Sequence, residues 1–255
     1  MDLWLPPLVA LFIWWFGTGV VMLLDGLPRD TFRWSLATST LLAAGALLCI
    51  ARSAGSADVP GAYAAFTCAV LVWGWHELTF LTGWLTGPRK HACSAPLHGP
   101  TRFGQAVQAI LWHELALVAS GALITALTWR QPNQVATWTF WLLWVMRLSA
   151  KFNLFLGVRN RGEELLPPHL LYLGSYFRRR SHNALLPLSL LGGVLVAAAL
   201  VDAAVGSPQG GARTGLLLVS SLCVLAVIEH LLLVAPLPAS LLWRWALRTP
   251  QAPAP

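Results

Sequence analysis

The 255-residue chain is apolar and basic: 56% of its residues are hydrophobic, 11% are charged, and the formal net charge is +7. This composition leaves too little polar surface for a soluble domain and indicates an integral membrane protein. Basic residues in such a protein are topology signals first, so the charge implies no nucleic-acid partner. The four cysteines show neither metal-finger nor disulfide-framework spacing, which leaves both of those classes without support.

Seven apolar runs follow one another, each about the twenty residues needed to cross a bilayer. They lie near residues 3–24, 34–51, 60–85, 103–129, 134–156, 184–205 and 214–235. Turn-forming residues separate them, such as Gly26 and Pro28 after the first run and Pro132 after the fourth. The pattern predicts an all-α polytopic bundle of seven transmembrane helices, forming one membrane domain over residues 1–255.

Lysine and arginine are distributed unevenly between the connections. The loops after the first, third and fifth runs, with the C-terminal tail, hold twelve of them, and the remaining connections hold three. The positive-inside rule therefore predicts a periplasmic N-terminus and a cytoplasmic C-terminus. The expected location is the bacterial inner membrane, cytoplasmic or intracytoplasmic, with the chain crossing it several times.

A four-residue motif occurs twice inside apolar runs. Trp-His-Glu-Leu at 75–78 recurs at 112–115, placing His76 with Glu77 and His113 with Glu114. The predicted topology puts both copies at one depth, roughly 17–18 Å from the cytoplasmic ends of their helices at 1.5 Å per residue. Ionisable groups in hydrocarbon need partners and are functional candidates.

Two further runs carry charged residues to a similar depth. The fifth run supplies Arg147 and Lys151, one helical turn apart, with Asn153 beyond them. The seventh supplies Glu229 and His230. We expect these side chains to meet the two Trp-His-Glu-Leu copies in the cytoplasmic half of the bilayer.

Three interpretations of this convergence stay open. It forms a structural ion network that fixes helix packing. Alternatively it binds a metal ion, because His and Glu on facing bundle helices ligate metals, although the Glu-x-x-His spacing of di-iron proteins does not occur. In the third, histidines are axial ligands of a bacteriochlorophyll- or haem-type tetrapyrrole. The candidate metal ligands are His76, Glu77, His113, Glu114, Glu229 and His230, and the candidate tetrapyrrole ligands are His76, His113 and His230.

The loop from Gly157 to Asn183 is predicted to be a membrane-surface or partner-binding loop. Leu170, Leu173 and Phe177 recur at helical spacing before a run of arginines, which favours a short interfacial helix. The alternative is a basic loop that only fixes topology. Its candidate contact residues are His169, Tyr172, Tyr176, Arg178, Arg179 and Arg180. A second interfacial helix is expected in the tail, from Leu241, Leu242, Trp243, Arg244, Trp245 and Arg248.

Five sequence blocks are distinctive in combination: WHELTFLTG at 75–83, WHELAL at 112–117, KFNLFLGV at 151–158, LPPHLLYL at 166–173 and SYFRRR at 175–180. They resemble the PuhE family of photosynthetic complex assembly proteins from purple-type phototrophic bacteria. The resemblance extends from the first run to about residue 235. It implies a role in assembling the reaction centre and core light-harvesting complex, or in delivering pigment to it, and it transfers no catalytic role to any residue.

The function expected from the sequence is therefore an assembly factor. Its expected partners are membrane lipids and reaction-centre subunits, core antenna subunits or pigment-synthesis enzymes. The alternative is a membrane metalloenzyme that uses the His/Glu site to modify a pigment, quinone or carotenoid. Transport is a further class, but it should show inverted repeats with interrupted helices, and only the two Trp-His-Glu-Leu runs pair in that way.

Overall fold

The computed structural model describes residues 3–94, 99–235 and 242–247 and contains seven long α-helices. They are α1 (Leu5–Asp25), α2 (Phe32–Ser53), α3 (Val59–Leu81), α4 (Pro100–Leu127), α5 (Val135–Leu156), α6 (Leu185–Gly206) and α7 (Gly211–Leu232). Three 3-10 segments, η1 (Arg29–Thr31), η2 (Glu163–Leu165) and η3 (Pro168–Tyr176), complete the described elements. The expected all-α fold is confirmed for these residues, and every helix begins and ends within a few residues of its predicted run.

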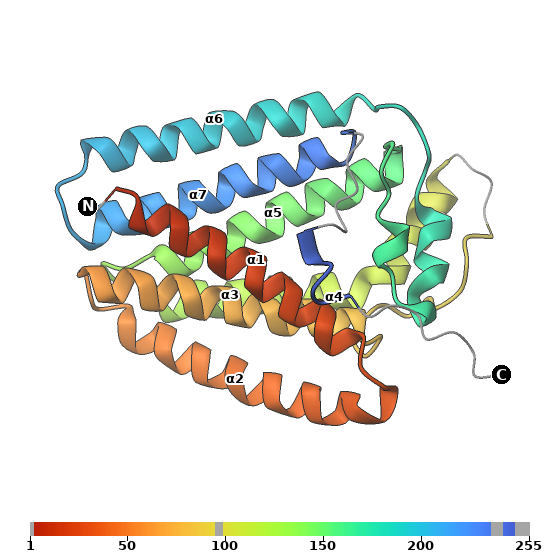
Figure 1. Cartoon of the computed structure of the whole chain (residues 1–255), viewed down its shortest axis with the longest axis horizontal. Helices are drawn as coiled ribbons and strands as arrows, with labels where there is room; N and C mark the ends of the chain where they lie inside the picture. Colours follow the sequence, from red (N-terminus) through yellow and green to blue (C-terminus); the bar gives the residue numbers. More distant parts are fainter. Residues whose placement is uncertain (1–2, 95–98, 236–241, 248–255) are drawn as a thin grey trace.

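The helices run back and forth along the long axis of the molecule (Figure 1). Local sequence sets several of their starts. The Asp58 carboxylate accepts a hydrogen bond from the Gly61 N–H at 2.9 Å at the start of α3, and Pro100 occupies the first turn of α4. The connections after α3 and α5 gather at the end of the bundle where α1 turns into α2 (Figure 1). We call this the loop end.

Six of the seven helices are long and apolar enough to cross a membrane: α1, η1 with α2, α3, α4, α6 and α7. Helix α5 has the length, at 22 residues, but carries Arg147, Lys151 and Asn153 in its second half. The structure thus shows a multi-pass helical protein. Whether α5 is a seventh span, and which way the chain is oriented, remain predictions.

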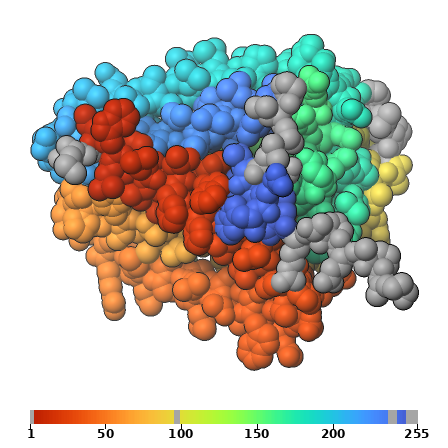
Figure 2. Space-filling view, in the orientation of Figure 1, coloured from red at the N-terminus to blue at the C-terminus, as the bar shows by residue number. Residues whose placement is uncertain are grey.

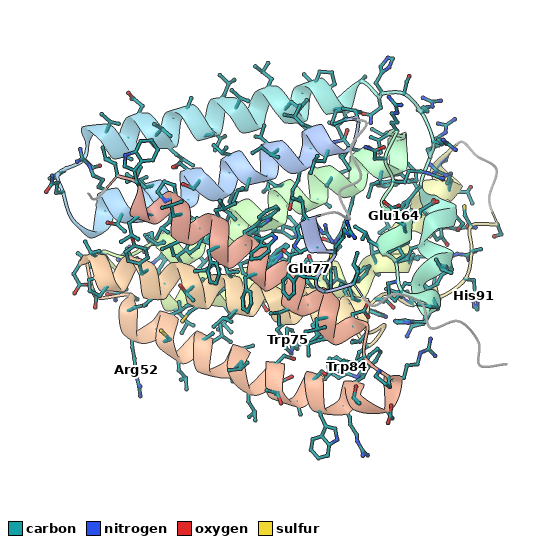
Figure 3. All side chains as sticks on the ribbon, viewed as in Figure 1. Arg52, Trp75, Glu77, Trp84, His91 and Glu164 are labelled. Carbon is teal, nitrogen blue, oxygen red and sulfur yellow. The ribbon has the colours of Figure 1, made fainter. Side chains whose placement is uncertain are left out.

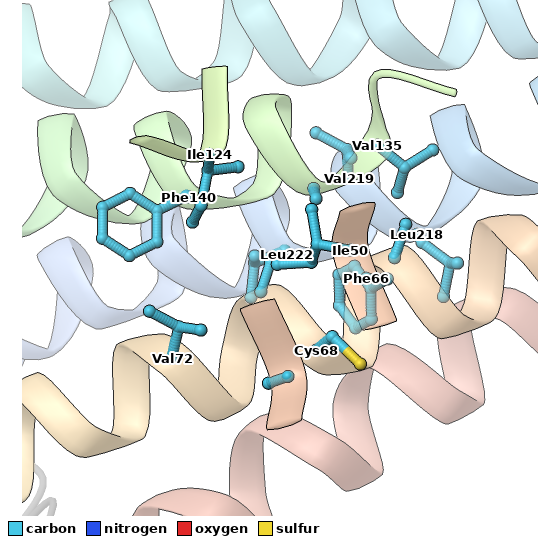
Figure 4. Packing of buried hydrophobic residues seen from close by; sticks show 14 of the residues in the cluster. Ile50, Phe66, Cys68, Val72, Ile124, Val135, Phe140, Leu218, Val219 and Leu222 are labelled. Atoms are coloured by element: carbon cyan, nitrogen blue, oxygen red, sulfur yellow. The ribbon is translucent and has the colours of Figure 1, made fainter. Parts of the chain in front are cut away.

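Helices α3 and α7 form the centre of the bundle. In each, 56% of the most apolar stretch is buried, against 11–22% in α1, α2, α4 and α6. Their inner faces meet α5 in an apolar core that includes Phe66, Val72, Phe140, Leu218 and Leu222 (Figure 4). The outer helices turn large apolar side chains outward, among them Leu8, Phe12, Leu41, Leu188 and Leu195. An outward apolar surface of this kind suits contact with lipid.

The chain between α3 and α4 is held against α4 by backbone hydrogen bonds. The His113 N–H donates to the Thr86 carbonyl at 2.9 Å, and the Arg89 N–H donates to the Gln108 carbonyl at 3.4 Å. A Cβ on Gly87 would lie 2.0 Å from the Gln108 carbonyl oxygen. Glycine is therefore needed here because the two backbones approach too closely for any side chain.

Candidate functional site

The charged side chains of the bundle interior form two ion pairs, both made by α5. Arg147 Nη2 lies 3.0 Å from Glu77 Oε2 on α3, and Lys151 Nζ lies 2.5 Å from Glu114 Oε1 on α4. Arg147 and Lys151 are one turn apart, so one face of α5 serves both Trp-His-Glu-Leu copies. We call Glu77, Glu114, Arg147, Lys151 and Glu229 the charged cluster.

Glu229 joins the charged cluster from α7 without an ion-pair contact of its own among the described residues. Its Oε1 accepts a hydrogen bond from Trp14 Nε1 on α1 at 2.8 Å. It is close enough to Arg147 to interact electrostatically, as are Glu77 and Glu114. Glu114 also accepts a bond from Trp144 Nε1 at 3.2 Å. The two tryptophans were not expected as partners, because an apolar run gives no sign of where an indole N–H will point.

The three histidines are fully enclosed by protein, and His76 and His113 lie within electrostatic range of Lys151. His76, His113 and His230 are 0%, 1% and 1% exposed. His76 Nε2 is hydrogen-bonded to Ser120 Oγ at 2.9 Å, and its ring centroid is 6.3 Å from that of His113. Phe80 packs on His113 with a centroid separation of 4.5 Å. The Nδ1 atoms of His76 and His113 are buried without a hydrogen-bond partner among the described residues.

His230 and Asn153 belong to a separate polar contact between α5, α6 and α7. His230 Nε2 is hydrogen-bonded to Ser149 Oγ at 3.0 Å, and Ser149 Oγ donates to Ser189 Oγ at 2.9 Å. The Asn153 amide donates to the same Ser189 oxygen at 3.1 Å. The structure thus divides the predicted single network into ion pairs near the centre and a hydroxyl-rich contact towards α6. Serines on those helices gave no distinguishing signal in the sequence.

The geometry bears on the metal and tetrapyrrole interpretations. In the described part of the chain, no three His, Cys, Asp or Glu side chains are grouped closely enough to hold a metal ion. The proposed ligands His76, Glu77, His113, Glu114, Glu229 and His230 are therefore not assembled into one centre. The three histidine rings are packed among protein atoms. Both ligand roles stay predictions.

A large cleft opens beside the charged cluster. Its volume is about 2170 Å³, well above the range of roughly 300–1,000 Å³ usual for small-molecule pockets. We call it the central cleft. Its charged and polar lining near mid-helix comes from Glu77, Arg147, Lys151 and Glu229, and its aromatic lining includes Trp14, Trp73 and Trp75. Figure 3 shows Glu77 midway along the bundle, far from Glu164 and His91 at the loop end.

The C-terminal segment 242–247 lies over one side of this cleft. Trp243 is 5% exposed, and its Nε1 donates to the Trp15 carbonyl at 3.0 Å. The Trp245 ring is stacked on Phe16 with centroids 5.9 Å apart. Figure 2 shows the segment filling the surface between α1 and the connection that follows α5. Trp243 packs into the protein, whereas Leu242 and Trp245 are exposed. The expected interfacial helix stays a prediction, and Leu241 and Arg248 lie outside the described residues.

The loop after α5 also packs inward. Leu170, Leu173 and Tyr176 of η3 are buried against Phe80 of α3 and Ala109 of α4. The ends of α3 and α4 thus cover this apolar face, and the expected position of the segment at the membrane surface stays a prediction. Arg179 and Arg180 are exposed and remain available to headgroups or a partner.

Polar residues of η3 hold it in place. The His169 ring N–H donates to the Leu81 carbonyl at 2.7 Å. Burial lowers the pKa of His169, and nearby Arg29 lowers it further. Burial also raises the pKa of the Tyr172 phenol. The Tyr176 hydroxyl accepts a bond from Arg89 Nε at 2.7 Å and donates to the His91 carbonyl at 2.9 Å.

These features define a polytopic helical membrane protein with paired charges and a large cleft in its interior. The chain belongs to the family described as "Protein of unknown function (DUF3623)", whose model matches residues 1–254. It is 36% identical to a Rhodobacter capsulatus protein named "Uncharacterized 30.4 kDa protein in puhA 5′ region", over 98% of this chain and 93% of that one. No solved structure matches the chain.

Proposed function

We propose that this protein is an assembly factor for the photosynthetic reaction centre and core light-harvesting complex, or for pigment delivery to them. The observation that carries the proposal is the 36% identity, over nearly the whole of both chains, to the R. capsulatus protein whose name refers to the puhA 5′ region. That name indicates a photosynthesis-gene context. The PuhE-like blocks of the sequence agree with it.

The arrangement of the molecule supports a role as an assembly factor more than a role as an enzyme. The charged side chains are mostly engaged with one another in ion pairs, and the described residues gather no metal-binding group. The central cleft and the exposed arginines at the loop end instead provide surfaces for client molecules. The protein acts in the bacterial inner membrane, with seven spans, a periplasmic N-terminus and the loop end in the cytoplasm.

Deleting the gene in a phototrophic host tests the proposal. The amount of assembled reaction centre and core antenna, measured from membrane absorption spectra and complex yield, should fall while respiratory growth is unchanged. Affinity capture of the tagged protein should recover reaction-centre subunits, core antenna subunits or pigment-synthesis enzymes. Normal spectra and normal complex yield under several light and oxygen regimes would contradict the proposal.

A further inference from the structure

The central cleft contains a cation whose hydrogen-bonding capacity is largely unused. A guanidinium has five N–H donors, and Arg147 gives one of the two at Nη2 to Glu77. Arg147 lies in the second half of α5 and lines the cleft, and its side chain is 44% exposed. Glu77, by contrast, is 14% exposed. Arg147 thus presents several free donors to the space inside the cleft.

The walls around Arg147 are apolar and sterically open. They include Trp14, Trp73, Leu143 and Met146, from α1, α3 and α5. Two glycines, Gly17 on α1 and Gly74 on α3, also line the cleft. A Cβ on either would meet no atom within 4 Å. With a volume of about 2170 Å³, the cleft accommodates an apolar body of lipid size beside the donor group.

The charge of the surroundings limits what that body can carry. Two cations, Arg147 and Lys151, are each paired with a carboxylate, Glu77 and Glu114, and Glu229 lies within electrostatic range of Arg147. A negatively charged headgroup would add an anion that no further cation of this cluster balances, in a medium of low dielectric constant, which is unfavourable. An uncharged oxygen acceptor satisfies the Arg147 donors without that penalty. Ligand hydroxyls could in turn donate to Glu77 Oε1, which is buried with no partner among the described residues.

We propose that the central cleft binds a membrane-dissolved amphipathic molecule with an uncharged headgroup bearing carbonyl or ester oxygens, held by Arg147, and an apolar body that packs on Trp14 and Trp73. The site takes its ligand from the bilayer. This inference does not depend on the photosynthetic role, because it follows from the cleft and its charges alone.

Photoaffinity labelling of the full chain in lipid nanodiscs tests the inference. The probe is a monoacylglycerol with a diazirine and an alkyne in its acyl chain, and the comparison probe is the free fatty acid with the same chain. The monoacylglycerol should label saturably, and the labelled peptides should come from the cleft faces of α1, α3, α5 and α7. The fatty acid should label those peptides at least about fivefold less.

Glycine substitutions provide matched variants. Gly74→Leu places a branched apolar side chain in the cleft, where its Cβ meets no atom within 4 Å. It should lower saturable labelling at least about fivefold, and Gly17→Leu gives a second variant if the first does not accumulate. Gly45→Leu, on the exposed face of α2 with equally open space, should label as the wild type does. Arg147→Lys keeps the charge but loses donors, and should weaken monoacylglycerol labelling several-fold. Equal labelling of Gly74→Leu and Gly45→Leu would contradict the proposal that the ligand binds in the central cleft. Stronger labelling by the fatty acid would contradict the proposed preference for an uncharged headgroup.

Discussion

At the scale of single residues, α5 supplies both cations that neutralise Trp-His-Glu-Leu carboxylates. Removing one partner from such a pair leaves a charge in an apolar interior without compensation. We predict that Lys151→Met lowers the unfolding free energy in detergent by about 3 kcal/mol, because breaking a buried pair is strongly destabilising. Thermal unfolding followed by circular dichroism measures the change.

The double variant Lys151→Met, Glu114→Leu separates the effect of an unpaired charge on stability from the effect of altered packing. If the loss comes from an uncompensated carboxylate, the double variant should recover most of the stability of the wild type. Arg52→Met, at an exposed residue pointing away from the bundle (Figure 3), should leave stability unchanged. A double variant less stable than Lys151→Met would contradict the charge argument.

Metal chelation tests whether the buried histidines hold a metal ion. Since the described residues gather no three potential ligands, His76, His113 and His230 are expected to act through hydrogen bonds and ring packing. Exhaustive dialysis against a chelator should leave the melting temperature and the absorption spectrum of the purified protein unchanged. A marked fall in melting temperature, reversed by one added metal ion, would restore the metal interpretation.

At the scale of elements, the contact between α1 and the C-terminal segment is open to a sharp test. A Cβ on Gly19 would lie 2.0 Å from the Trp245 ring, whereas a Cβ on Gly17 would meet nothing within 4 Å. Gly19→Ala should therefore displace the segment at a cost of about 1–3 kcal/mol, typical of overpacking. Trypsin should then cleave after Arg244 about tenfold faster than in the wild type.

Gly17→Ala is the matched control for that experiment, because it adds the same methyl group two residues away on α1. Its cleavage rate should equal that of the wild type. Equal rates in Gly19→Ala and Gly17→Ala would mean that Trp245 does not hold the segment against α1.

The elements also show how far the sequence could predict this molecule. Span lengths and boundaries were predictable because apolar run length and turn residues determine them locally. Shared depth and the cost of unpaired charge predicted that Arg147 and Lys151 meet the two Trp-His-Glu-Leu copies, but not that Arg147 pairs with Glu77. The inward packing of η3 and Trp243 was not predictable, because the apolar face of a short segment packs equally well on lipid or on protein, and only the tertiary arrangement decides. The hydrogen bonds that Trp14, Ser120 and Ser149 make to Glu229, His76 and His230 were not predictable for the same reason.

At the scale of the whole molecule, topology is the first claim to test. Twelve of the lysines and arginines outside the spans fall in connections assigned to the loop end or the tail. We predict seven spans with a cytoplasmic C-terminus. Reporter fusions after Pro255 and within residues 207–212 should therefore report opposite sides of the membrane. Reports from the same side would show that α7, which lies between the two fusion sites, does not cross and that the span count is wrong.

We propose that the central cleft is where this protein would act in photosynthetic complex assembly. Complementation of a deletion strain tests it most directly, with the wild-type gene, Gly74→Leu and Gly45→Leu expressed to equal abundance. The yield of reaction centre and core antenna should be restored by the wild type and by Gly45→Leu, and should stay at the deletion level with Gly74→Leu. Full restoration of the yield by Gly74→Leu would contradict this role of the central cleft.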